Sequence, residues 1–250
     1  MAKEIDCDVN VYPTMDTYQC ALMCKGIKEG LIPTTLYKYR STRRVMEFLG
    51  NGQLMFATSD TFNDPYECKL IIDTSIDGKP GKWTETIEQI AKESIENVIW
   101  SCGIFSCTTE YDNIPMWAHY ADNHQGCCLE FDVTKDLDFF NFPMKVSYDN
   151  TYPSCHYFKD GKTDTKEIVM ALFHKSEAWS YEHEVRVVKR CFHGLHHLHP
   201  KALKSIILGI ENKEEQKIMA ALSSNPVWSH VQLKRPELSR TSYTMKIVEI

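Results

Sequence analysis

Two glutamates and an arginine occupy alternate positions near residue 180: Glu182, Glu184 and Arg186. The surrounding segment, residues 179–188, begins with aromatic residues and ends with β-branched ones, which is typical of a strand. Alternate strand residues point to one face, so the two carboxylates would lie about 7 Å apart, with the guanidinium a similar distance further on. Such a row is either a solvated face with paired charges or a carboxylate pair in a cleft, oriented by Arg186.

A second acidic segment, residues 62–67, contains Asn63, Asp64 and Glu67. Asn-Asp-Pro is turn chemistry, because Asx side chains cap a turn and proline fixes φ. A simple turn between strands is therefore one interpretation. Glu67 argues for more, because it begins the apolar stretch 68–72, which we expect to be a strand.

Basic residues gather where a strand is expected to meet a helix. Residues 36–40 predict the strand, Ser41 is a plausible N-cap, and residues 42–49 predict a short helix that ends at Gly50-Asn51-Gly52. The first backbone N–H groups of a helix are unpaired and attract anions. Lys38, Arg40, Arg43 and Arg44 lie in or beside this junction. They indicate a phosphate or pyrophosphate site, or a scatter of surface charges.

The composition narrows the class of protein. The 250 residues include 28 Lys and Arg against 34 Asp and Glu, a formal net charge of −6. This balance argues against a protein that binds duplex DNA. No apolar run approaches the roughly 20 residues of a membrane helix, and the charged N-terminal segment has no apolar core of a signal peptide. We therefore expect a cytoplasmic protein without a membrane partner.

The ten cysteines contain no C-x-x-C pair, which argues against a zinc site. Cys102, Cys107, Cys127 and Cys128 lie in apolar stretches and are expected to be reduced core thiols. The histidines of residues 193–199 have helical spacings, but the segment lacks the glutamate of a zincin, and Gly194 and Pro200 favour a loop. We expect no metal, and the role of these histidines stays open.

The order of expected elements predicts an α+β fold, with about eight strands and four or five helices. The chain is expected to form a single domain, residues 1–250. Within it, residues 1–34 form an N-terminal helical leader and residues 35–250 an α+β core of the kind found in enzymes.

Four segments together resemble the bacterial family known as domain of unknown function 2971. They are Leu36-Tyr37-Lys38-Tyr39-Arg40-Ser41, Phe62-Asn63-Asp64-Pro65-Tyr66-Glu67, Met116 through Gly126 with the sequence MWAHYADNHQG, and Trp179 through Arg186 with the sequence WSYEHEVR. They fall in the order of that family and cover about residues 36–210. The family's name implies no activity.

More distantly, the order of the expected strands and helices is similar to the ADP-ribosyltransferase fold, a split or mixed β-sheet that binds NAD. Residues 36–52 match its first strand and short helix, with Lys38 or Arg40 in place of the usual His or Arg. Its middle motif would be Ser106, in the segment Phe105-Ser106-Cys107-Thr108, or Tyr120. Its last motif, a glutamate on a strand, would be Glu184, followed by Pro200 and the apolar segment Ile206-Ile207-Leu208.

This resemblance implies a role for each residue. Breaking the bond between nicotinamide and ribose builds positive charge on the sugar, which a fixed carboxylate stabilises. Glu184 would fill that role, Glu182 would position or deprotonate the acceptor, and Arg40 with the helix start would bind the diphosphate. The catalytic set is then Glu184, Glu182 and Tyr120, the cofactor-binding set Tyr39, Arg40, Ser41, Ser106 and Trp117, and the remaining site residues Asn63, Asp64, Glu67 and Arg186.

The leading hypothesis is an NAD-dependent ADP-ribosyltransferase or NAD glycohydrolase, including toxins and phage-defence effectors. NAD would be the substrate, a small-molecule nucleotide, and a protein, a nucleic acid or water would be the acceptor. Two alternatives stay open. One is a non-enzymatic domain that binds a nucleotide or phosphate ligand at residues 40–44. The other is a metal-dependent hydrolase that uses Asp64, Glu67, Glu182 and Glu184.

Overall fold

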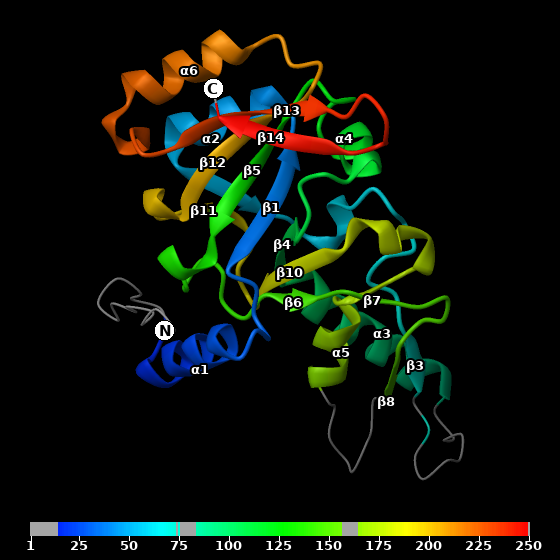
Figure 1. The fold of residues 1–250 in the computed structure, drawn as a ribbon. Helices are drawn as coiled ribbons and strands as arrows, with labels where there is room; N and C mark the ends of the chain where they lie inside the picture. Colours follow the sequence, from blue (N-terminus) through cyan, green and yellow to red (C-terminus); the bar gives the residue numbers. More distant parts are fainter. Residues whose placement is uncertain (1–14, 74, 76–83, 157–164, 250) are drawn as a thin grey trace.

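The structure is a computed structural model that describes residues 15–73, 75, 84–156 and 165–249. Its largest element is a mixed eight-stranded sheet (Figure 1). In spatial order the strands are β14 (Met245–Glu249), β13 (Gln232–Leu238), β12 (Leu203–Leu208), β5 (Cys127–Asp132), β1 (Thr35–Arg40), β4 (Gly103–Thr108), β10 (Glu184–Lys189) and β6 (Met144–Lys145). β12 and β13 are parallel and the other pairs antiparallel. The expected α+β class and the large mixed sheet are thus confirmed.

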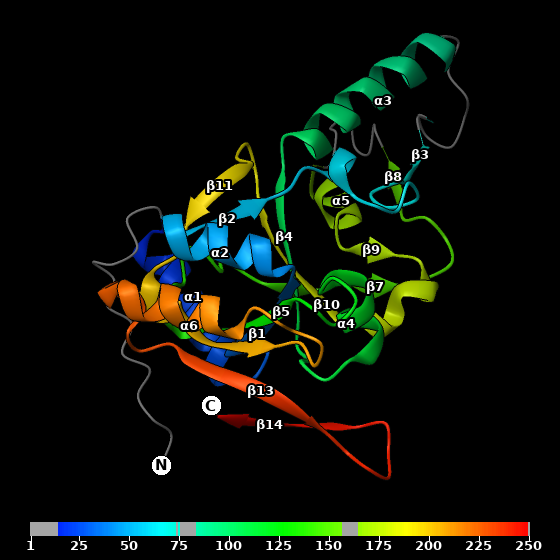
Figure 2. The same cartoon turned by 90° about the horizontal axis from the view of Figure 1, so that it is seen from above.

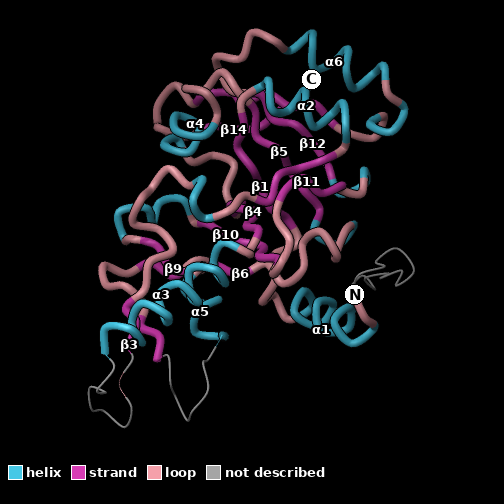
Figure 3. The backbone as a smooth tube through the Cα atoms, turned by 180° about the vertical axis from the view of Figure 1, so that it is seen from behind, coloured by secondary structure: helices cyan, strands magenta, loops and turns pink. Residues whose placement is uncertain are grey.

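Helices pack around this sheet, and three short strand pairs form separate two-stranded sheets. The helices are α1 (Thr17–Lys28), α2 (Thr42–Asn51), α3 (Thr84–Trp100), α4 (Ile114–Tyr120), α5 (Thr165–Ala171) and α6 (Glu215–Ser224). The strand pairs are β2 (Gln53–Phe56) with β11 (Gly194–His197), β3 (Ile71–Asp73) with β8 (Ser154–His156), and β7 (Ser147–Tyr148) with β9 (His174–Lys175). Figure 3 shows α1 beside the sheet and α3 and α5 next to each other.

Strand alternation distributes the core over both sheet faces. Leu36 packs on one face with residues from α2 and α6, which lie side by side in Figure 2. Tyr39 packs with α4 through Trp117. Cys102, Cys107, Cys127 and Cys128 are free, buried thiols, as expected. The sheet core is therefore two-sided, and the two faces need different helices to cover them.

The sheet nearly separates between β1 and β4. β1 pairs with β5 at every residue from Thr35 to Arg40, but with β4 only at Tyr37, opposite Thr108. β4 instead pairs with β10 along its whole length. Past the single Tyr37–Thr108 pair, β1 and β4 part, which opens a wedge lined by side chains of both strands.

Three sequence-based expectations about local structure are wrong. Residues 177–182 form a 3-10 helix and His183 has a φ of 46°, so the strand starts at Glu184. Residues 68–70 precede β3, and the φ of 58° at Cys68 turns the chain there. Residues 194–197 form β11 because they pair with β2. In each case a turn or a distant strand overrides local propensity.

Candidate active site

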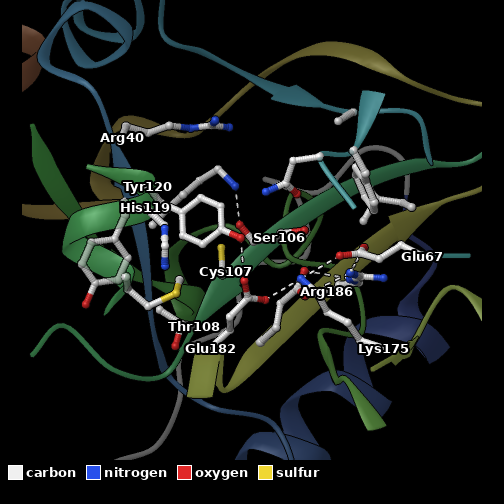
Figure 4. A pocket seen from close by; sticks show the side chains of 18 of the residues that line it. Arg40, Glu67, Ser106, Cys107, Thr108, His119, Tyr120, Lys175, Glu182 and Arg186 are labelled. Carbon is white, nitrogen blue, oxygen red and sulfur yellow. Dashed lines mark hydrogen bonds and ion pairs between the residues drawn. The ribbon is translucent and has the colours of Figure 1, made fainter. Parts of the chain in front are cut away.

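A cavity of about 440 Å³ lies in the wedge between β1 and β4 (Figure 4). Residues from the two diverging strands, β10, α4 and the 62–67 turn line it. They include most of the predicted site residues: Tyr39, Arg40, Asn63, Glu67, Ser106, Tyr120, Glu182, Glu184 and Arg186. The fold thus brings together side chains that the sequence spreads over five segments.

Three glutamates and two cations form a buried network on one wall. The Arg186 guanidinium lies 2.7 Å from Glu184 Oε1 and 2.6 Å from Glu67 Oε2. Lys175 Nζ lies 2.7 Å from Glu67 Oε1, 2.5 Å from Glu182 Oε2 and 3.5 Å from Glu184 Oε2. All five side chains are buried. Because carboxylates exceed cations here, the wall carries a net negative charge.

The network shifts the pKa values of the two candidate catalytic carboxylates, Glu184 and Glu182, in opposite directions. Burial raises the pKa of Glu184, but the adjacent Arg186 guanidinium more than offsets this and lowers it to about 2. Burial also raises the pKa of Glu182, and Lys175 offsets this only in part. Glu184 is thus a permanently charged group, whereas Glu182 is suited to accept a proton.

Tyr120 connects α4 to this wall. Its hydroxyl donates a 2.6 Å hydrogen bond to Glu182 Oε1. The helix begins with Asn113, whose side chain accepts from the Met116 N–H, and carries Pro115 in its first turn. These start signals place the last turn, with His119 and Tyr120, at the cavity (Figure 4).

Two cations from β1 also line the cavity. Lys38 Nζ donates to the Ser106 carbonyl oxygen and lies 4.2 Å from the Phe105 ring centroid. Burial lowers the pKa of Lys38 to about 7, with a further contribution from Arg40. Arg40 projects into the cavity in Figure 4, and no described residue forms an ion pair or hydrogen bond with its guanidinium. An anionic ligand would supply the missing partner.

Three of the predicted site residues lie outside this cavity. Ser41 is the N-cap residue of α2, but its side chain makes no capping hydrogen bond. Trp117 is only 1% exposed, packs edge-on against Tyr39 and donates to the Tyr111 carbonyl oxygen. Its position is that of a core residue. Asp64 lines a neighbouring cavity and caps the Tyr66 N–H.

Sequence reasoning missed Lys175 and His119 as site residues. Lys175 belongs to β9, a two-residue strand whose pairing with β7 no local pattern reveals. The turn-rich sequence before it gives no hint that its ammonium contacts three glutamates. His119 precedes Tyr120 on α4 and lies within the predicted segment 116–126, which is the signal that could have found it.

Metal ligation finds no support in the geometry of the acidic wall. Within the ranges that the structure describes, no three His, Cys, Asp or Glu side chains are grouped as metal ligands. The three buried glutamates converge on the Lys175 ammonium and the Arg186 guanidinium instead. In the histidine segment, the ring of His196 lies against Phe56 and Phe192.

A family model described as a protein of unknown function, DUF2971, matches residues 116–187. This stretch runs from α4 to β10 and contains Tyr120, Lys175, Glu182, Glu184 and Arg186. The match supports the similarity to that family over these residues. No curated protein and no solved structure matches the chain, so the likeness to the ADP-ribosyltransferase fold gains no support from a structural neighbour. None of the helices in the described ranges has the length and apolarity to cross a membrane.

Proposed function

We propose that this protein is an NAD-dependent ADP-ribosyltransferase or NAD glycohydrolase that uses the cavity between β1 and β4. One observation carries the proposal: the same cavity is lined by two cations of β1, Lys38 and Arg40, and by two carboxylates, Glu182 and Glu184. A dinucleotide has complementary chemistry, because its diphosphate is anionic and its nicotinamide riboside is cationic.

The proposed reaction cleaves the bond between nicotinamide and ribose C1. The bonding electron pair leaves with nicotinamide and neutralises its ring, while positive charge develops on the ribose. Glu184, ionised and fixed by Arg186, stabilises that charge. The acceptor hydroxyl or water forms the new bond to C1, and its proton passes to Glu182.

Other residues of the cavity would bind the remainder of the substrate. Arg40 and the protonated form of Lys38 would hold the diphosphate, and a bound diphosphate would raise the pKa of Lys38. The half-buried Tyr120 ring, oriented by its bond to Glu182, would contact nicotinamide. Trp117, which sequence reasoning placed in the cofactor-binding set, is not needed for this contact.

The experiment incubates the purified full chain with NAD and quantifies free nicotinamide by chromatography. Arg40→Gln should raise the KM for NAD roughly 10- to 100-fold, because it removes a charge-assisted contact with the substrate. Glu182→Gln should lower kcat by about 100-fold or more, because it removes the proton acceptor. Thermal melts of each variant check that it is folded.

Arg43→Gln is the matched control for Arg40→Gln, since Arg43 lies on the exposed face of α2 and pairs with Glu47. It should leave NAD turnover unchanged. Absence of nicotinamide release by the wild-type chain, or equal rates in the wild type and Glu182→Gln, contradicts the proposal. Saturable NAD binding without turnover would favour the non-enzymatic nucleotide-binding domain, for which the Lys38 and Arg40 side chains already argue.

A further inference from the structure

A second cavity, of about 520 Å³, adjoins the first. The two share Lys175, which lines both. The second cavity is formed by the 64–69 turn, the 149–153 loop and residues 174–179. None of its other residues lines the first cavity, so it is a separate space behind the acidic wall.

Aromatic rings and carboxylates both line this second cavity. Trp179, Tyr66 and Tyr152 contribute rings, and Tyr66 and Tyr152 are exposed to solvent. Asp64 and Asp149 contribute carboxylates, and no described cation forms an ion pair with the buried Asp64. Hydrogen bonds from Thr151 lower the pKa of Asp149, which keeps it charged.

Two lysines, Lys69 and Lys175, also line this cavity, but no described ion pair joins either of them to Asp64 or Asp149. Lys175 contacts three glutamates of the acidic wall, so its charge is more than balanced. Lys69 is exposed, and His174 Nδ1 lies 3.1 Å from the Met170 carbonyl oxygen. Aromatic rings and carboxylates both attract an organic cation. The face of an aromatic ring carries partial negative charge, and a carboxylate forms a charge-assisted hydrogen bond with the cation.

We propose that the second cavity is a binding site for an organic cation, specifically for a guanidinium group. The Asp64 carboxylate would accept hydrogen bonds from the guanidinium, and the rings of Trp179 and Tyr152 would contact its planar faces. The occupant would lie next to the acidic wall, because the Trp179 ring centroid is 5.0 Å from Lys175 Nζ and Lys175 Nζ is 2.5 Å from Glu182. This site does not depend on the proposed NAD chemistry.

The test measures binding of N-acetylarginine methylamide to the full chain by calorimetry, with the neutral citrulline analogue as the matched ligand. The arginine compound should bind at least about tenfold more tightly, because only it carries the charge. Asp64→Asn should reduce its affinity by about tenfold or more while keeping a side-chain oxygen for the Tyr66 N–H. Asp60→Asn, at an exposed position in the same loop region, should have no effect.

Three outcomes would overturn the proposal: no binding of the arginine compound in the millimolar range, equal affinity for the citrulline analogue, or equal losses in Asp64→Asn and Asp60→Asn. Tyr152→Leu provides a second check that does not alter charge. This substitution should lower the affinity for the arginine compound severalfold, since it removes an aromatic face from an exposed loop. Unchanged affinity in this variant would also contradict the proposal. NAD turnover plays no part in these readouts.

Discussion

Glu67 and Arg186, which lie 119 residues apart in the sequence, form a 2.6 Å ion pair in the interior. The pair fastens the 62–67 turn to strand β10. Arg186 is only 1% exposed, and its remaining donors reach Glu184 and the Leu172 carbonyl oxygen. A buried guanidinium is stable only while carboxylates and carbonyl oxygens pair with its N–H groups. Removing one member of the acidic wall therefore leaves another charge buried without a partner.

Arg186→Met should therefore destabilise the chain strongly. The loss removes the partner of two buried carboxylates, and we expect the free energy of unfolding to fall by about 3–5 kcal/mol. Urea unfolding followed by circular dichroism measures it. Arg43→Met is the control, because its pair with Glu47 is exposed, and it should change stability little. Equal effects of the two substitutions would show that the buried network adds nothing.

Tyr120→Phe should shift the pH dependence of NAD turnover. The Tyr120 hydroxyl lowers the pKa of Glu182 by donating to its carboxylate, against the burial that raises it. Without the hydroxyl, the pKa of Glu182 rises further, so the acidic limb of the kcat/KM profile should move up by about 0.5–1 pH unit. Below this limb Glu182 is protonated and cannot accept the acceptor's proton.

The control for this shift is Tyr18→Phe, which removes a hydroxyl from an exposed residue of α1. Its profile should overlay that of the wild type. An unmoved acidic limb in Tyr120→Phe, or a limb displaced to lower pH, would remove Glu182 from the proposed role of proton acceptor.

Trp117→Ala tests whether this residue supports the core or binds ligand. Trp117 fills the space between α4 and Tyr39, so its loss should cost about 3–5 kcal/mol of unfolding free energy, measured in urea. The KM for NAD should change far less than in Arg40→Gln. Trp100→Ala, at a half-exposed helix end, is the matched control. A stable Trp117→Ala variant with a strongly raised KM would assign the ring to the substrate instead.

The sequence predicted those parts of the site that depend on local patterns. The β1–α2 junction was predicted because Ser41 and Gly52 bracket a helix that follows a strand-forming stretch. Glu182 was predicted to share a strand face with Glu184, which is wrong, because the left-handed backbone of His183 ends a 3-10 helix between them. Both carboxylates nevertheless meet at Lys175.

Long-range pairing accounts for what the sequence left out. Lys175 reaches three glutamates only because β9 pairs with β7, and the cavity exists only because β1 pairs with β4 at a single position. No local propensity encodes where two strands separate. Asp64 illustrates the same limit, because it lies three residues from Glu67 and yet faces a different cavity.

Lys38 should make stability depend on pH in the alkaline range. Burial and the neighbouring Arg40 lower its pKa to about 7 in the folded chain, from the ordinary lysine value of 10.5 that applies in the unfolded chain. Between these values the unfolded chain binds more protons than the folded one, so this residue's contribution to stability rises with pH from about 7 to 10.5. Lys38→Met cannot titrate and lacks this increase. The difference in unfolding free energy, wild type minus variant, should therefore increase between pH 7 and pH about 9.5 in urea titrations.

Lys28→Met, at an exposed position of α1, controls for the loss of a lysine as such. A difference that stays constant or falls with pH would mean that Lys38 keeps its proton in the folded chain, and the cavity would then offer two permanent cations to its ligand.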